Sequence, residues 1–321
     1  MKRYVINEDA LPLSADLRVA GTHCFLRTNS EDVLASLSRW TEPSGRKQGK
    51  SFDLSVLVDP RATRGKDTAV YFRGLHHLVF AILGEDERFV FDLSRHRVSA
   101  VVSKQTAGDA AFWDTRVLPL VLGTLGATIG LVPLHCACLD RNGDALLLAG
   151  ESGTGKSTLA VCLSRHGFAV VSDGWTYMAM DKDKLTAHGI SAHVKLLPDA
   201  VNHFPELHGL QSARAFNGEI SFEVDVAQTF RAAIRCESRP RWLMFLERVG
   251  QPGCNIIPVG GDVAQTFFEN SVERLSAQLR EAEVARGELL KSLTSAECWL
   301  AQYGGPPNLA AGAISRFCER M

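Results

Sequence analysis

The chain has 321 residues, 45% of them hydrophobic and 22% charged, so it is long enough for two globular domains. Its 35 basic residues almost balance 36 acidic ones, and this gives no overall positive field that would attract nucleic acid. We therefore expect no nucleic-acid partner. The 8 cysteines include no Cys-x-x-Cys pair, which indicates reduced thiols and a cytoplasmic protein.

The first 105 residues predict an α+β unit. Strands are expected at 19–26 and 55–58, with a helix between them that begins near Ser30. Four further apolar runs are separated by short polar connectors, which predicts an antiparallel meander. These runs lie at 69–72, 77–83, 88–93 and 98–102. We expect this unit (1–105) to recognise a substrate or a partner.

The apolar stretch 117–139 has transmembrane length and carries no formal charge apart from that of a protonated His135. Prolines and glycines interrupt it, so it is not expected to cross a membrane. We predict a buried helix from about 107 to 129, a turn at Gly130 and a buried strand over 134–139.

A glycine-rich segment follows the apolar run 145–149 and precedes an expected helix over 157–166. It matches the pattern Gly-x-x-x-x-Gly-Lys-[Ser/Thr], the P-loop, in which backbone N–H groups surround a phosphate. The lysine supplies positive charge, and the hydroxyl that follows it holds Mg²⁺. The expected nucleotide-binding residues are Gly150, Glu151, Ser152, Gly153, Thr154, Gly155, Lys156, Ser157 and Thr158.

His135 and Asp173 flank this segment on the two neighbouring predicted strands. Asp173 ends the apolar run 168–171, and ligands bind at the carboxyl ends of strands in open α/β sheets. A carboxylate there accepts a proton from an attacking hydroxyl or holds Mg²⁺, and a nearby histidine orients it. The simpler alternatives are a turn-forming aspartate and a core histidine.

Three segments resemble one known family. They are Leu134-His-Cys-Ala-Cys-Leu-Asp140, Leu146–Ser157 and Gly167-Phe-Ala-Val-Val-Ser-Asp173. Together they resemble the catalytic core of the HPr serine kinase/phosphorylase family, whose fold is related to phosphoenolpyruvate carboxykinase. The resemblance implies ATP and Mg²⁺ as cofactors, with Asp173 as general base and metal ligand.

The same resemblance assigns the other site residues. His135 would support the base, and Lys156 and Ser157 would act on phosphate and Mg²⁺. It implies an α/β fold with a P-loop nucleotide-binding core of the HPr kinase/phosphoenolpyruvate carboxykinase type. The pattern of apolar runs places this core at 106–260, after the N-terminal α+β unit and before a C-terminal helical region (261–321). Helices are expected over most of 262–300 and over 309–321.

The sequence also departs from that family. Gly174 stands where the family has a second aspartate, and no counterpart of its later arginine-bearing segment is found. The first 105 residues do not resemble the family's regulatory domain. The resemblance is thus to HPr-kinase-related P-loop proteins, some of which phosphorylate peptide serines, rather than to a standard HPr kinase.

Three further residues are weaker candidates. Glu247 and Arg248 end the predicted strand 242–246, where a carboxylate that assists Mg²⁺ often follows in P-loop proteins. A surface ion pair is the simpler explanation. Lys195 is a candidate phosphate contact, with a solvated side chain as the alternative.

The leading hypothesis is an ATP-dependent kinase that phosphorylates a hydroxyl (serine-type) group. The acceptor would be a peptide, a protein or a small molecule, and the resembling family suggests a homo-oligomer. The alternative is a nucleotide-binding switch or assembly protein without catalysis. A transport ATPase subunit is disfavoured because the sequence has no Leu-Ser-Gly-Gly-Gln-like motif.

Overall fold

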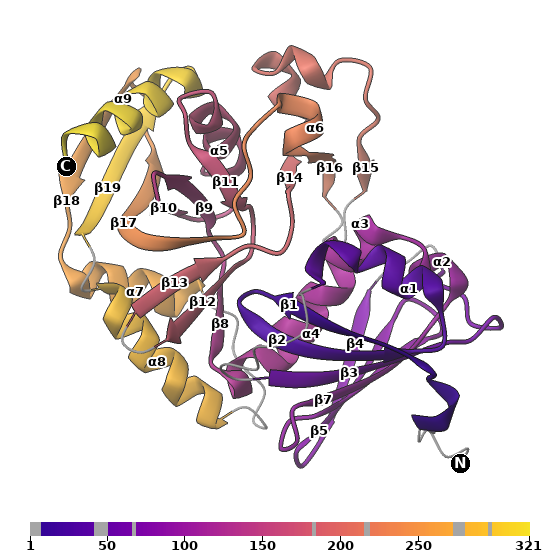
Figure 1. Cartoon of the computed structure of the whole chain (residues 1–321). Coiled ribbons are helices and arrows are strands. Elements are labelled where there is room, and N and C mark those ends of the chain that lie inside the picture. Colours follow the sequence, from indigo (N-terminus) through magenta and orange to yellow (C-terminus); the bar gives the residue numbers. More distant parts are fainter. Residues whose placement is uncertain are drawn as a thin grey trace. The chain divides into compact units, whose positions relative to one another are not determined.

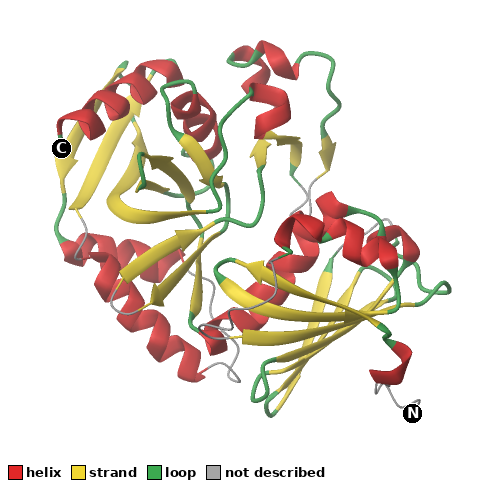
Figure 2. Ribbon diagram, in the orientation of Figure 1, coloured by secondary structure: helices red, strands yellow, loops and turns green. Residues whose placement is uncertain are grey.

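A computed structural model describes residues 8–41, 51–65, 69–181, 184–214, 219–271, 280–294 and 297–321. The chain forms two compact units. The first comprises the described parts of Met1–Leu131 and Leu275–Ala285, and the second those of Val132–Arg274 and Arg286–Met321. The fold is mixed α/β (Figure 2).

The first unit contains a twisted sheet with the strand order β1-β2-β3-β7-β6-β5-β4 (Figure 1). Inward-facing and outward-facing residues alternate along β2, as in a sheet with one buried face. Its strands are β1 (Leu13–Val19), β2 (Thr22–Thr28), β3 (Ser51–Val58), β4 (Val70–Leu75), β5 (Leu78–Leu83), β6 (Glu87–Asp92) and β7 (Arg97–Val102). Strands β4 to β7 pair antiparallel in sequence order, which confirms the predicted meander.

The single strand predicted over 19–26 is wrong. Ala20 and Gly21 have φ values of 49° and 72° and form the two-residue turn of a β1–β2 hairpin, in which Val19 pairs with Thr22. Positive φ at both turn residues matches the right-handed twist of the flanking strands.

The helical segments of residues 8–131 lie before β1, between β2 and β3, and after β7. They are η1 (Glu8–Ala10), α1 (Glu31–Ser36), η2 (Ser38–Trp40), α2 (Lys104–Ala107), α3 (Ala110–Phe112), the π-helical η3 (Trp113–Val117), α4 (Leu118–Leu125) and η4 (Gly126–Ile129). The Ser36 hydroxyl donates to the carbonyl of Ala107, and the Trp40 indole donates to Asp114, so residues 104–117 belong with the N-terminal strands. Gly130 ends the segment at a φ of 78°, as predicted. No helix in the described ranges is both long and apolar enough to cross a membrane.

The second unit is built on a sheet with the order β11-β9-β10-β17-β13-β12-β8, to which β19 and β18 are added beside β17 (Figure 1). Its first elements are β8 (Leu131–Leu134), β9 (Ala137–Arg141), β10 (Asp144–Ala149), α5 (Lys156–Ser164), β11 (Ala169–Ser172), β12 (Thr176–Asp181), β13 (Lys184–His188), β14 (His193–Leu196), η5 (Pro198–Asn202) and η6 (Pro205–Leu207). They are followed by β15 (Ala213–Arg214), β16 (Ile220–Asp225), α6 (Val226–Phe230), β17 (Glu237–Arg248), β18 (Gly253–Pro258), α7 (Gly261–Ser271), β19 (Glu297–Gly304) and α9 (Pro307–Arg320). Helix α8 (Arg280–Thr294) belongs to the first unit as far as Ala285 and to the second from Arg286.

Strand directions bring several chain segments to one edge of this sheet. Strand β17 is parallel to both β10 and β19, whereas β9 is antiparallel to both β10 and β11. The carboxyl ends of β10, β11, β17 and β19 therefore share an edge with the start of β9. Residues far apart in the sequence converge there.

Two sequence expectations for this unit are corrected. The strand predicted over 134–139 is interrupted at His135 and Cys136, where the Cys136 N–H donates to the Leu134 carbonyl. Residues 297–304 form strand β19 rather than the end of a helix, because Glu297–Tyr303 pair with β17 and Ala301 and Tyr303 are buried. The C-terminal region therefore contributes a strand to the sheet as well as helices.

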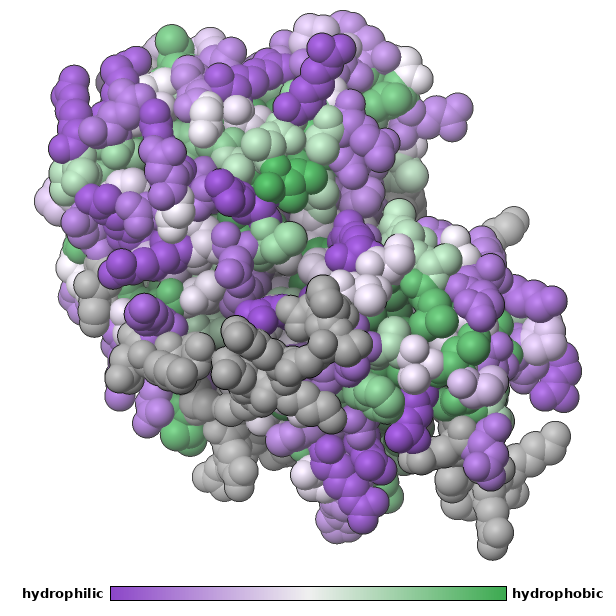
Figure 3. Space-filling view, in the orientation of Figure 1, coloured by the Kyte–Doolittle hydropathy of each residue, from purple (hydrophilic) through white to green (hydrophobic). Residues whose placement is uncertain are grey.

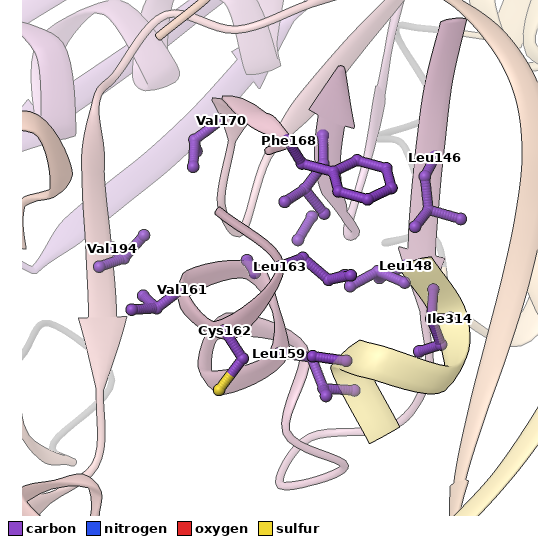
Figure 4. Close-up of a cluster of buried hydrophobic side chains, with 14 of the residues drawn as sticks. Leu146, Leu148, Leu159, Val161, Cys162, Leu163, Phe168, Val170, Val194 and Ile314 are labelled. Atoms are coloured by element: carbon purple, nitrogen blue, oxygen red, sulfur yellow. The ribbon is translucent and has the colours of Figure 1, made fainter. Parts of the chain in front are cut away.

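Helix α5 is held against the sheet by a continuous apolar core. Leu159 and Leu163 of this helix pack among Leu146 and Leu148 of β10 and Ile314 of α9, all with no exposed surface (Figure 4). Buried strands of this kind have near-continuous apolar sequences, as β10 does. On the outside, polar side chains predominate over the face shown in Figure 3. The helix that follows the glycine-rich segment is thus rigidly anchored.

Replacing Leu163 with alanine is expected to lower the free energy of unfolding by about 2–5 kcal/mol, because the substitution leaves a cavity in a closed core. Guanidinium denaturation measures this loss. Leu309→Ala is the matched control, since Leu309 is 58% exposed on α9. Equal effects of the two substitutions would contradict the packing described for α5.

Candidate active site

The glycine loop (150–155) connects β10 to α5. Gly150, Gly153 and Gly155 have φ values of 158°, 82° and 89°, and the last two lie in the left-handed region that favours glycine. A Cβ atom at Gly155 would also collide with the Tyr303 hydroxyl. Helix α5 begins at Lys156 with no side-chain cap, so its first N–H groups remain available to an anion.

Lys156 is folded over this loop. Its side chain is 8% exposed, and Nζ donates to the carbonyl oxygens of Gly150 at 2.8 Å and Glu151 at 3.0 Å. Burial lowers the pKa of the ammonium group, while the nearby Asp173 carboxylate opposes this change. Among the described residues, these carbonyl oxygens are the hydrogen-bond partners of Nζ, and a buried cation of this kind is well suited to attract phosphate oxygens.

Asp173 follows β11 at the same edge. Its Oδ2 accepts a hydrogen bond from the Lys195 backbone N–H at 3.2 Å, whereas Oδ1 is buried without a hydrogen-bond partner among the described residues. Burial raises the pKa of this carboxyl; the Ser157 hydroxyl, the Lys195 and Gly174 N–H groups and the Lys156 charge act in the opposite direction. An unpartnered buried carboxylate oxygen is costly, which points to a ligand or a catalytic role.

Ser157 and Asp173 fit a Mg²⁺ ion. Mg²⁺ prefers oxygen ligands and is commonly held by one or two protein oxygens together with substrate phosphates and water. The unpartnered Asp173 Oδ1 and the nearby Ser157 hydroxyl provide such oxygens. No cluster of three or more His, Cys, Asp or Glu residues suited to a metal occurs in the described chain.

His135 lies in the break between β8 and β9, at the edge that carries the glycine loop. The residue is exposed, and its ring lies 5.5 Å from that of Trp175. Partial desolvation and then the charges of Lys156 and Lys195 lower its pKa, which favours the neutral imidazole. Within the described residues it forms no hydrogen bond with Asp173, so a supporting role for His135 stays a prediction.

Glu247 and Arg248 end β17, on the opposite side of β10 from β9 and β11. The Glu247 carboxylate is exposed and accepts a hydrogen bond from Gln302 Nε2 at 2.8 Å. Its role as a magnesium ligand is untested. Lys195 contributes a backbone donor to Asp173, and its Nζ lies 2.9 Å from Glu219 Oε2, so its side chain is engaged with an acid.

Tyr303 is a site residue that the sequence did not reveal. It lies near the carboxyl end of β19, and its hydroxyl donates to the carbonyl of Thr154, 149 positions away in the sequence. The Arg248 guanidinium lies 5.4 Å from the centre of the Tyr303 ring. Tyr303 thus fixes the glycine loop from β19 and places a second cation beside it.

Tyr303→Phe is expected to weaken nucleotide binding by about 2- to 12-fold, the equivalent of one lost hydrogen bond of 0.5–1.5 kcal/mol. Isothermal titration calorimetry with ATP measures the change, and Tyr71→Phe, at a side chain 62% exposed on β4, is the control. Unchanged affinity in Tyr303→Phe would show that the hydroxyl does not hold the loop in its binding conformation.

The comparisons with known proteins do not assign the chain to a family. No protein-family model matches the sequence, and no curated protein matches it. Among solved structures, it is similar to the HPr(Ser) kinase/phosphatase from Coxiella burnetii at a TM-score of 0.32 and 12% sequence identity. That match covers 59% of this chain and 89% of the other.

Proposed function

We propose that this protein is an ATP-dependent kinase that transfers the γ-phosphoryl group to a hydroxyl group on a peptide, a protein or a small molecule. The observation that carries the proposal is the buried, unpartnered Oδ1 of Asp173 at the edge where the glycine loop, Lys156 and Ser157 meet. This arrangement combines an anion cradle, a buried cation and a carboxylate whose Oδ1 has no hydrogen-bond partner in the described part of the chain.

Each residue then has a defined task. The loop N–H groups and Lys156 would bind the phosphates and stabilise the charge that develops on them. Ser157 and Asp173 would hold Mg²⁺, which neutralises phosphate charge when bound. The oxygen of the acceptor hydroxyl would form a bond to the γ-phosphorus while Asp173 takes up the hydroxyl proton. At the same time the bond between the γ-phosphorus and the bridging oxygen would break, and ADP would leave with that oxygen.

The same observations support the finer fold assignment, a P-loop core related to the HPr kinase/phosphoenolpyruvate carboxykinase type. Strand β10, the glycine loop and α5 follow each other as that motif requires. Asp173 follows the next strand that is parallel to β10. We also propose the cytoplasm as the compartment, since all 8 cysteines are free.

Two parts of the proposal concern partners. The acceptor is defined only by the hydroxyl group that receives the phosphoryl group, and we propose a peptide, a protein or a small molecule in this role. We propose the N-terminal unit (1–105) as a recognition module, as its sequence suggests, and a homo-oligomeric state, as the resemblance to the HPr kinase family implies.

A nucleotide-binding switch without transfer is the second candidate, and Gly174 is the observation that favours it. Because glycine has no side chain, no carboxylate at this position supports Asp173, although a Cβ atom there would meet nothing within 4 Å.

Incubation with γ-labelled ATP, Mg²⁺ and extract from the source cells separates the two functions. Label in a protein, a peptide or a metabolite that depends on this enzyme supports the kinase. Nucleotide binding without any labelled product supports the switch.

A further inference from the structure

A cavity of about 530 Å³ opens beside the glycine loop, and no residue role assigned so far explains it. One wall is made by the first arm of the loop, from Glu151 to Thr154. The remainder is formed by the end of β17, Leu300 in the middle of β19, Val259 just after β18 and Val263 at the start of α7. Any molecule in this cavity therefore lies directly against the loop proposed to hold phosphate.

The cavity walls differ in chemistry. Apart from the loop, most of the lining residues are apolar, and Glu247 and Arg248 supply polar groups. The apolar side chains are those of Phe245, Leu246, Val259, Val263 and Leu300. A mostly apolar pocket with a few polar groups is typical of sites for flat organic ligands, and its volume lies in the usual range for them.

The cavity lies on the side of the loop away from Asp173. Asp173 follows β11, which is reached from β10 through β9, whereas the cavity is lined by β17 and β19 on the other side of β10. A hydroxyl acceptor must approach the end at which Asp173 lies. The cavity is therefore placed for the opposite end of a phosphate-bearing ligand.

We infer that this cavity binds the nucleoside of the nucleoside triphosphate, with the ring packed against Val259, Val263 and Leu300 and polar edges facing Glu247 and Arg248. The inference rests on the proposed function, because it takes the phosphates to lie on the glycine loop. The ligand would then cross the loop from the cavity to Lys156, Ser157 and Asp173. Affinity for ATP would depend on both regions, and affinity for inorganic tripolyphosphate on the loop alone.

Val263→Trp tests this inference in the full-length protein. Val263 is 50% exposed in the first turn of α7, so a larger side chain can be accommodated in the fold while it fills the cavity. Leu309→Trp adds the same side chain at an exposed position outside the cavity lining. Calorimetry with Mg²⁺–ATP and with Mg²⁺–tripolyphosphate measures both affinities in each variant and in the Lys156→Ala variant.

The expected result is that Val263→Trp weakens ATP binding at least tenfold and leaves tripolyphosphate binding unchanged, while Leu309→Trp changes neither. Unchanged ATP binding in Val263→Trp would overturn the nucleoside site, and so would an equal loss for both ligands. Failure of the proposed function has a different signature: neither ligand would bind the unmodified protein, or Lys156→Ala would leave both affinities intact.

Discussion

Replacing Lys156 with alanine is expected to weaken ATP binding by about 10- to 150-fold, because a hydrogen bond to a charged group contributes about 1.5–3 kcal/mol. The effect should be large because this ammonium group is almost fully buried in the loop, where water screens its charge poorly. Equilibrium binding of Mg²⁺–ATP gives the affinity of each variant.

Lys184→Ala is the control for this substitution, since Lys184 is an exposed lysine of the same unit on β13. It removes the same charge from the protein without touching the loop. If Lys156→Ala bound ATP as tightly as Lys184→Ala, the phosphate-binding role of Lys156 in the proposed function would be contradicted, and the lysine would only hold the carbonyl oxygens of Gly150 and Glu151.

Asp173→Asn is expected to abolish phosphoryl transfer, with a rate loss of about 10²- to 10⁴-fold, while ATP still binds. An asparagine oxygen can still accept the Lys195 N–H, so the local backbone keeps its partner, but the amide cannot take the proton of the acceptor. Equilibrium binding measures the change in ATP affinity, and single-turnover kinetics measures the change in transfer rate. A large loss of rate with unchanged affinity identifies a base, whereas a loss of affinity identifies a binding residue. Full transfer activity in Asp173→Asn would exclude this carboxylate as the base.

Stability provides an independent readout for the same substitution. Burial raises the pKa of Asp173 in the folded state, so its ionisation opposes folding. The protonated Asp173 carboxyl contributes its full stability at pH values below the pKa that this group has in the unfolded chain. This contribution is lost as the pH rises through the pKa of Asp173 in the folded protein. Asp173→Asn is thus expected to raise the free energy of unfolding at neutral pH, and lost transfer cannot then be ascribed to unfolding.

Local chemistry made the glycine loop and several turns predictable from the sequence. Gly130, Gly153, Gly155 and Gly167 all have positive φ values, and each occupies a turn, cap or loop position that favours glycine. The meander of the first unit was also predictable, because short polar connectors leave antiparallel pairing as the simplest arrangement.

Features that depend on pairing between distant segments of the chain could not be predicted from the sequence. Glu297–Gly304 follows helix α8 and is short enough to fit either state, and only its pairing with β17 makes it a strand. Because Tyr303 belongs to that strand, its contact with the loop could not be anticipated either. The interruption between β8 and β9 at His135 could not be predicted either, because the sequence is apolar on both sides of this residue.

The most direct test of phosphoryl transfer uses α-labelled and γ-labelled ATP in parallel, with the unmodified protein and Asp173→Asn. The reaction contains Mg²⁺ and extract from the source cells, and products are separated from nucleotide before counting. We predict that a product acquires the γ-label but not the α-label with the unmodified protein, and neither label with Asp173→Asn. Tight ATP binding with no labelled product from either isotope would contradict the assignment as a kinase.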